Sequence, residues 1–354
     1  MKKNILVADD SALMRRVICD IINSDEKFQV TDACRDGLEA YEKLKKQKYD
    51  AVLLDVYMPR LDGLHLLERL RDEHIKATVV MVSTLTTKDA AVTLQAMELG
   101  AVDFVTKPQN IIEAKGKDFR NELLGMLKAV LHTEMIRSQA ASVQTVTHLR
   151  STADSNRISP RKGKQLVALA CSTGGPKALH SVIPLLDPDM DAPMIVVQHM
   201  PVGFTQSLAE RLNALSKVQV KEAAEGDVLE KGKVYIAPGG KHMEIVCTAG
   251  VHKVHLSNAP AIGGLRPCAN VTYESLINSQ YDDIVCVVLT GMGADGTDGI
   301  RQLDQRKPVH VIAQSAQTCV VYGMPRAIAE AGLVDEVVPL ELVANTIMKN
   351  VGVK

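Results

Sequence analysis

The chain has 354 residues, of which 46% are hydrophobic and 23% charged, and its formal net charge at pH 7 is −1. These values are typical of a globular protein of two domains, and the near-zero charge argues against a surface built to bind nucleic acid. No apolar run approaches the ~18 residues needed to cross a bilayer, and the apolar stretch before Asp9 is too short for a signal peptide, so we expect a cytoplasmic protein.

Short apolar runs alternate with amphipathic helical patterns over about the first 110 residues. Helical spacing fills the gaps between the runs, for example over 11–22 and 90–99. Continuous apolar strands that alternate with helices are typical of a doubly wound parallel sheet. We therefore predict an α/β domain over 1–114 with a parallel five-stranded sheet, its strands at 4–8, 28–33, 51–54, 78–82 and 102–105.

Polar side chains lie just after four of these strands. Asp9 and Asp10 follow the first strand, Asp55 the third, Ser83 the fourth and Lys107 the fifth. The carboxyl ends of parallel strands meet at one edge of a sheet, where ligands bind. Three carboxylates there repel one another unless a cation is bound, and hard oxygen ligands suit Mg²⁺. A lysine and a hydroxyl beside them suit phosphoryl oxygens, so the pattern predicts a magnesium-dependent phosphorylation site.

The stretches ILVADDSALMR, LLDVYMPRLDGL, VVMVSTLT and GAVDFVTKP resemble the receiver domain of two-component response regulators. The resemblance implies that Asp55 accepts the phosphoryl group and that a histidine kinase supplies it. It also implies roles for the neighbouring residues: Mg²⁺ held by Asp10, Asp55, the backbone carbonyl of Tyr57 and, through water, Asp9; and switch residues Ser83, Phe104 and Lys107.

A connecting segment follows over 115–164. Residues 117–137 have helical spacing, with Phe119, Leu123, Leu127 and Leu131 on one face. From 138 to 164 the chain is rich in Ser, Thr, Gln, Arg and Lys and lacks apolar periodicity. That composition indicates a flexible linker.

Strand–helix alternation resumes after the linker, and a hairpin pattern covers 243–256 with Gly250 at its turn. We predict a second, three-layer α/β domain over 165–350, with a mainly parallel sheet and a β-hairpin. Its parallel strands are expected at 166–170, 194–197, 233–237, 284–289 and 309–313.

The stretch LVALACSTGGPKAL, residues 166–179, carries the first of these strands into a glycine turn. Ser172 in that turn is either a nucleophile or a helix N-cap; Ala170 replaces the first glycine of the nucleophile-elbow pattern, and no GxxxxGK[ST] phosphate loop follows. His199 follows the next strand and is therefore expected at the same edge as Ser172. Asp295 and Asp298 follow a further strand, and an acid there would hold the imidazole in its reactive tautomer.

The glycine loop at 291–296 leaves a second interpretation open, because it matches G-x-G-x-x-G between a strand and a helix. A dinucleotide site also needs an acid at the end of the following strand, where this chain has Gln314. A receiver that controls a non-hydrolytic nucleotide-binding or interaction domain therefore remains the alternative to a hydrolase.

Five stretches, ALACSTGGPKAL, VVQHMPVGFT, YIAPGGKH, LTGMGADGTDG and VVYGMPRAI, resemble the chemotaxis protein-glutamate methylesterase family. The resemblance implies that Ser172 is the nucleophile, His199 the general base and Asp295 the orienting acid. It places the N–H of Met292 at the oxyanion and Thr173 beside the nucleophile. The sequence departs from what we expect of the family at Cys171, Cys268 and Asn270.

The same resemblance implies a phosphorylation-activated hydrolase of chemotactic adaptation. Its substrates would be the glutamyl methyl esters of methyl-accepting chemoreceptors, with release of methanol, and certain receptor glutamines, with release of ammonia. A chemotaxis histidine kinase would be the phosphodonor. We expect no nucleic-acid partner, membrane association only through the receptors, and no cofactor in the catalytic half.

Overall fold

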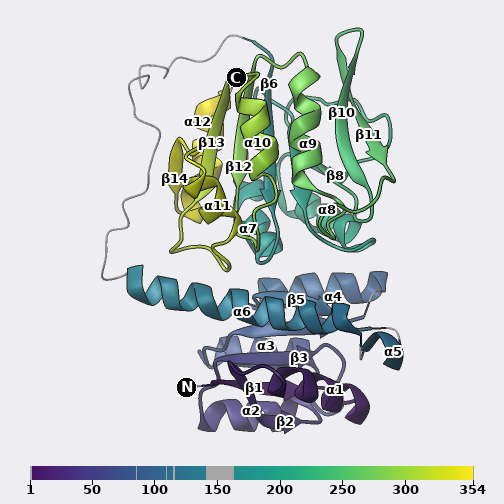
Figure 1. Cartoon of the computed structure of the whole chain (residues 1–354), viewed down its shortest axis with the longest axis vertical. Coiled ribbons are helices and arrows are strands. Elements are labelled where there is room, and N and C mark those ends of the chain that lie inside the picture. The colour runs from purple at the N-terminus through teal and green to yellow at the C-terminus, as the bar shows by residue number, and fades with distance from the viewer. Residues whose placement is uncertain (1, 85, 109, 115, 141–162, 354) are drawn as a thin grey trace. The chain divides into compact units, whose positions relative to one another are not determined.

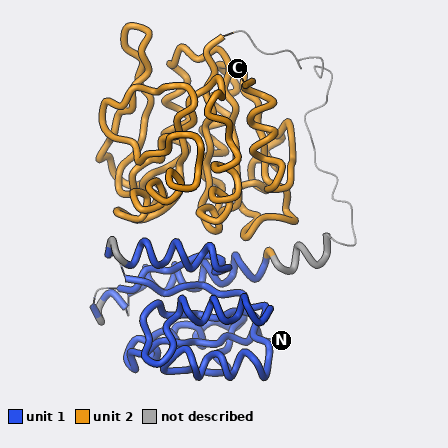
Figure 2. The backbone as a smooth tube through the Cα atoms, turned by 180° about the vertical axis from the view of Figure 1, so that it is seen from behind, with its two compact units in different colours: residues 1–132 blue, residues 133–354 orange. Residues whose placement is uncertain are grey.

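The structure, a computed structural model, describes residues 2–84, 86–108, 110–114, 116–140 and 163–353. The backbone forms two compact units, residues 1–132 and 133–354 (Figure 2). Most of the predicted linker, 141–162, lies outside the described residues. No helix of the described part of the chain is both long and apolar enough to cross a membrane.

The first unit alternates strands and helices (Figure 1). Its elements are β1 (Lys3–Ala8), α1 (Ala12–Asn23), β2 (Phe28–Cys34), α2 (Gly37–Lys46), β3 (Ala51–Asp55), α3 (Gly63–Asp72), β4 (Val79–Ser83), α4 (Thr87–Glu98), β5 (Asp103–Thr106), α5 (Ile111–Ala114) and α6 (Lys117–Ala140), whose last residues fall beyond the unit.

The five strands form one parallel sheet, as predicted, and their order is β2-β1-β3-β4-β5. Every residue of the central strands β3 and β4 is buried, whereas between its two buried end residues the edge strand β2 alternates exposed and half-buried positions. That difference explains the continuous apolar runs in the sequence. Because all strands run the same way, β1, β3, β4 and β5 end at one edge of the sheet.

The second unit is also α/β. Its elements are β6 (Gln165–Cys171), α7 (Gly175–Val182), the 3₁₀ helix η2 (Ile183–Leu185), β7 (Met194–Gln198), α8 (Phe204–Leu215), β8 (Gln219–Glu222), β9 (Lys233–Ile236), β10 (His242–Thr248), β11 (Val251–Ser257), α9 (Ala269–Ser275), the 3₁₀ helix η3 (Leu276–Asn278), β12 (Asp283–Val288), α10 (Thr297–Asp304), β13 (Val309–Gln314), α11 (Met324–Glu330), β14 (Glu336–Val338) and α12 (Leu340–Val351).

Seven strands form a parallel sheet in the order β14-β13-β12-β6-β7-β9-β8. Helices α7, α8 and α12 cover one face, and α9, α10 and α11 cover the other (Figure 1). This confirms the predicted three-layer α/β class. The main core lies between the sheet and α9–α11, where Leu166, Ile284 and Ile300 are fully buried.

Two strands of this sheet were not predicted, and both lie at its edges. β8 is four residues long and carries the polar sequence QVKE, and β14 is only three residues long. Neither has enough apolar residues to give a strand pattern. The predicted hairpin is present as β10 and β11 but forms a separate two-stranded sheet. Its turn residues Ala249 and Gly250 have φ of 51° and 79°, the left-handed backbone of a tight hairpin turn.

Candidate active site

Three adjacent strands of the second sheet bring Ser172, His199 and the glycine loop to one edge. Cys171 at the end of β6 pairs with Gln198 at the end of β7, so Ser172 and His199 begin neighbouring loops. The N–H of His199 donates to the carbonyl of Cys171 at 3.2 Å. The N–H of Ser172 donates to the carbonyl of Thr290, which follows β12, at 3.0 Å.

Ser172 lies on a tight turn between β6 and α7. The carbonyl of Ser172 accepts the N–H of Gly175 at 2.7 Å, and Gly174 has a φ of 76°, which favours glycine. The N-cap of α7 is Gly174, and the helix has no side-chain cap. The N-cap interpretation of Ser172 is therefore wrong, and its side chain is not used to begin the helix.

His199 and Asp295 form a hydrogen-bonded pair. Nε2 of His199 lies 2.8 Å from Oδ2 of Asp295, and the two side chains are only 8% and 5% exposed. Since a carboxylate only accepts, Nε2 carries the proton and Nδ1 has the free lone pair. The described part of the chain offers no partner to Nδ1, so Nδ1 is the ring nitrogen left for the serine hydroxyl.

The Asp295 carboxylate is held in its ionised form. Burial by itself raises the pKa of Asp295, but the hydrogen bond and charge of His199 and the backbone N–H groups of Ala269 and Asn270 outweigh it and lower the pKa to about 2. Those two N–H groups, at the start of α9, donate at 2.6 and 3.0 Å. A carboxylate fixed in this way stabilises a positively charged imidazole.

The structure also shows the contacts of Cys268 and Asn270, two positions at which the sequence departs from the pattern expected of the family. The Cys268 thiol donates to Oδ1 of Asp295, with Sγ 3.2 Å from the oxygen. Oδ1 of Asn270 accepts the N–H groups of Gly296 at 3.0 Å and Gly299 at 2.8 Å, which fixes the start of α10. Both residues thus position the loop that carries Asp295. No local sequence signal indicates a contact between residues about 27 positions apart.

Two backbone N–H groups near Ser172, those of Thr173 and Met292, have no hydrogen-bond partner among the described residues. The loop that carries Met292 is fixed because the carbonyl of Gly291 accepts the N–H groups of Gly323 at 3.1 Å and Met324 at 2.8 Å. Fixed, unpaired N–H groups of this kind can stabilise an oxyanion.

Gly291 allows the glycine loop to approach Ser172 closely. A Cβ added at Gly291 would lie 2.9 Å from Cβ of Ser172 and 2.4 Å from Sδ of Met324. We expect Gly291→Ala to displace the loop and lower kcat by roughly 10–100-fold, because ångström-scale misplacement costs about that much. Hydrolysis of a methyl ester, the reaction that the resemblance implies, measures the effect. Gly332→Ala is the control for a general loss of stability, since its φ of 69° disfavours alanine but an added Cβ there meets nothing within 4 Å. Equal activities for the two variants would contradict the expectation.

The dinucleotide interpretation of the glycine loop finds no acid to support it. Asp295, inside the motif, is turned toward His199. Gln314, at the end of β13, is fully buried, and its Oε1 accepts the N–H of Thr290 at 2.8 Å. Neither side chain is free to bind a ribose.

The first unit brings the predicted acid cluster together. Asp9, Asp10 and Asp55 each offer a carboxylate oxygen within 4.8 Å of the others. Nζ of Lys107 lies 2.9 Å from Oδ2 of Asp9 and 2.6 Å from Oδ2 of Asp55. Burial raises the pKa of Asp55 to about 6, although Lys107 acts against the rise. This donor set of hard oxygens at a sheet edge fits Mg²⁺.

The other predicted receiver residues lie on or just after the strands that carry this cluster and Lys107. Ser83 is buried at the end of β4, and its Oγ accepts the hydroxyl of Thr93 at 2.8 Å. Phe104 is buried on β5, and the side chain of Tyr57, two residues after Asp55, is 46% exposed.

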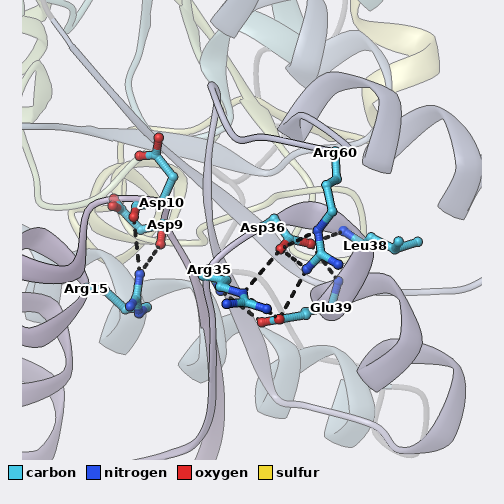
Figure 3. A network of polar contacts seen from close by, with 8 residues as sticks. All are labelled: Asp9, Asp10, Arg15, Arg35, Asp36, Leu38, Glu39 and Arg60. Carbon is cyan, nitrogen blue, oxygen red and sulfur yellow. Dashed lines mark hydrogen bonds and ion pairs between the residues drawn. The ribbon is translucent and has the colours of Figure 1, made fainter.

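Arginines fix the loops beside the acid cluster (Figure 3). Nη1 of Arg15 donates to the backbone carbonyl of Asp9 at 2.7 Å and to that of Asp10 at 3.4 Å. Asp36, whose side chain is 1% exposed, caps α2 and pairs with Arg60 in the loop after β3. Arg60 has a φ of 65°, so this ion pair stabilises an uncommon backbone conformation five residues after Asp55.

Comparison with known proteins gives two family matches. Residues 167–347 match the model of the CheB methylesterase family, and residues 5–115 match that of the response regulator receiver domain. A protein-glutamate methylesterase/protein-glutamine glutaminase of Geobacillus kaustophilus is 42% identical over 98% of both chains. One of Pyrococcus horikoshii is 41% identical over 99% of this chain and 94% of that protein. The crystal structure of the Thermotoga maritima CheB methylesterase catalytic domain, 38% identical, covers 52% of this chain and 98% of its own with a TM-score of 0.51.

Proposed function

The chain belongs to the CheB methylesterase family and has a response regulator receiver domain before the catalytic domain, and we propose that Ser172, His199 and Asp295 perform its ester hydrolysis. It is a phosphorylation-controlled chemotaxis protein-glutamate methylesterase and protein-glutamine glutaminase. The domains we assign are a receiver at 1–114, a connecting helix and linker at 115–164, and the catalytic domain at 165–350. The observation that carries the catalytic assignment is the His199–Asp295 pair at the sheet edge that holds Ser172.

The reaction begins when the Ser172 hydroxyl attacks the side-chain carbonyl of a glutamyl methyl ester. Nδ1 of His199 takes the hydroxyl proton, a step that typically contributes ~10²–10⁴-fold. Asp295 stays ionised and stabilises the imidazolium that forms. The N–H groups of Thr173 and Met292 receive the oxyanion, and one such donor stabilises the transition state by about 3 kcal/mol.

The second half of the reaction regenerates the serine. Collapse of the tetrahedral intermediate breaks the bond to the methoxy group, which leaves as methanol with the proton from His199. Water then attacks the acyl-serine, gives its proton to His199 and releases glutamate, while the proton passes back to Ser172. A glutamine side chain follows the same course and releases ammonia in place of methanol.

Control of the reaction begins at the receiver. Asp55 is the residue that accepts the phosphoryl group, and a chemotaxis histidine kinase is its donor. Mg²⁺, held by Asp9, Asp10, Asp55 and the carbonyl of Tyr57, would neutralise charge during the transfer. Lys107 and Ser83 then bind the phosphoryl oxygens, and Phe104 responds with them as the third switch residue.

The remaining assignments concern location and partners. The enzyme acts in the cytoplasm on the cytoplasmic parts of methyl-accepting chemoreceptors, and it meets the membrane only through them. The catalytic domain works without a cofactor, and nucleic acid is not a partner.

The coupling of the two domains gives a direct test. A small acyl-phosphate donor with Mg²⁺ should raise methanol release from methylated receptors by roughly 5–150-fold, the usual range for coupled sites. Asp55→Asn should respond to neither donor nor metal, and a chelator should abolish the response of the wild type. The surface variant Asp72→Asn, whose carboxylate pairs only with the adjacent Arg71 within the described residues, should respond normally.

Two results would contradict these assignments separately. An Asp55→Asn variant that responds like the wild type would show that the phosphoryl group is accepted elsewhere. A wild type that releases neither methanol nor ammonia under any condition would overturn the hydrolase assignment itself.

A further inference from the structure

The last residue of β7, Gln198, joins the nucleophile to the general base. Its side chain is buried, with 1% exposure. The amide nitrogen Nε2 donates to the backbone carbonyl of Ser172 at 3.1 Å and to that of His199 at 3.0 Å. An amide NH₂ has two protons, so these two bonds use its full donor capacity.

The other side of the amide fixes its orientation. Oε1 of Gln198 accepts the thiol of Cys171, with Sγ 3.0 Å away. Burial raises the pKa of the Cys171 thiol well above its ordinary value, so the thiol keeps its proton and acts as a donor. A flipped amide would turn its oxygen toward two carbonyl oxygens, an arrangement without a proton to share. The amide can therefore bond in one orientation only.

The turn after Ser172 is shaped around this amide. A Cβ added at Gly175 would lie 1.9 Å from Oε1 of Gln198 and 3.1 Å from Sγ of Cys171. Glycine at this position therefore lets the amide reach the Ser172 carbonyl. The contact between Gln198 and the Ser172 carbonyl therefore depends on the backbone of the turn as well as on the Gln198 side chain.

We propose that Gln198 is a positioning residue for ester hydrolysis, whose amide sets the separation between the backbone of the nucleophile and that of the general base. This inference rests on the proposed catalytic roles of Ser172 and His199. Gln198 bonds backbone atoms and is buried, so it acts through its neighbours and does not touch substrate. Its loss would shift Ser172 relative to Nδ1 of His199, and a displacement of about 1 Å can lower the rate ~10²-fold.

The test compares Gln198→Met with a matched control in the full-length protein. Tyr235→Phe is the control, because one buried hydroxyl there also bonds two backbone groups, the carbonyl of Val228 at 2.7 Å and the N–H of Glu230 at 3.1 Å. The two backbone groups that Tyr235 bonds lie before β9, whereas the catalytic residues follow the carboxyl ends of parallel strands.

Three quantities are measured for each variant: kcat and KM on methylated receptors, the rate at which phenylmethanesulfonyl fluoride labels Ser172, and Tm. Gln198→Met should lower kcat by roughly 10–100-fold and slow labelling in parallel, with KM changed by less than about 2-fold. Tyr235→Phe should lower Tm and leave kcat and the labelling rate unchanged. A purely structural role for Gln198 would affect Tm alone.

The proposal is wrong if folded Gln198→Met keeps kcat and the labelling rate within about 2-fold of the wild type. If the methionine variant does not fold, Gln198→Glu, which has the same shape but lacks the amide donors, is held to the same limit. Ser172→Ala in the same series distinguishes failure of the proposed catalytic role of Ser172 from failure of the proposed role of Gln198. An active Ser172→Ala variant would overturn the catalytic assignment, whereas an inactive one beside a fully active Gln198→Met would overturn only the role of Gln198.

Discussion

Replacing Ser172 with alanine is expected to lower kcat for methanol release by about 10⁶-fold, the loss seen when a serine hydrolase loses its nucleophile. The neighbouring thiol of Cys171 cannot take its place, because it is fully buried, donates to Oε1 of Gln198 and stays protonated. The residual activity would come from substrate binding and the oxyanion donors, which remain intact.

The same substitution should leave the fold unchanged. The structure records no hydrogen bond from the Ser172 hydroxyl to the described residues, whereas its backbone N–H and carbonyl, which alanine keeps, make the contacts of the turn. The expected change in the free energy of unfolding is therefore within about 0.5 kcal/mol. Thermal unfolding and methanol release measured together separate this result from simple loss of structure.

Ser181→Ala is the matched control. That serine lies near the C-terminal end of α7, and among the described residues its hydroxyl bonds only the carbonyl of Lys177, at 3.2 Å. The variant should retain the activity of the wild type. Methanol release from Ser172→Ala at more than a few per cent of the wild-type rate would show that the nucleophile is a different residue.

The sequence predicts most of the catalytic edge because strand direction is readable from it. Ser172 and His199 each come two positions after a predicted apolar strand, and parallel strands carry such residues to one edge. Strand direction alone leaves both Asp295 and Asp298 as candidates, the family resemblance favours Asp295, and the structure shows how the two differ. Asp298 lies in the first turn of α10, is 71% exposed and pairs with Arg301, while Asp295 precedes the helix and faces His199.

Contacts between segments that are far apart in the chain could not be predicted from the sequence. Cys268 and Asn270 hold Asp295 and its loop from the start of α9. Gln198 bonds backbone carbonyls, which every residue type has, so no particular side chain in the sequence indicates the contact. Periodicity reports burial and strand direction, but it contains no information on which polar atoms meet. The short edge strands β8 and β14 could not be predicted for a related reason. They are stabilised by pairing with β9 and β13, and they have no apolar pattern of their own.

Asp295→Asn is expected to lower kcat by about 10⁴-fold, although the two side chains have the same shape. Oδ1 of Asp295 accepts from the N–H groups of Asn270 and Gly296 and from the Cys268 thiol, whereas Oδ2 accepts from the Ala269 N–H and from His199. The new NH₂ group therefore takes the Oδ2 position, where it displaces fewer donors.

An NH₂ group at that position donates to Nε2 of His199 and reverses the tautomer. The imidazole proton moves to Nδ1, which can then no longer accept the proton of the Ser172 hydroxyl. Loss of activity thus follows from the wrong tautomer and not from a missing side chain. Nitrogen chemical shifts of the His199 ring, recorded for wild type and variant, report the tautomer directly.

Asp298→Asn, which changes an exposed carboxylate three residues away, should keep both the activity and the His199 tautomer of the wild type.

The pH dependence of stability provides a second readout for Asp295→Asn. Because the pKa of Asp295 is lowered to about 2 in the folded protein, below the ~3.9 of an unfolded aspartate, its charge stabilises the fold above pH ~4, and that contribution is lost as the pH falls through the folded value. The asparagine variant should lack this part of the acid sensitivity. If Asp298→Asn lost activity while Asp295→Asn kept it, the orienting acid would be the helical residue, and the hydrogen bond at Nε2 would have no part in catalysis.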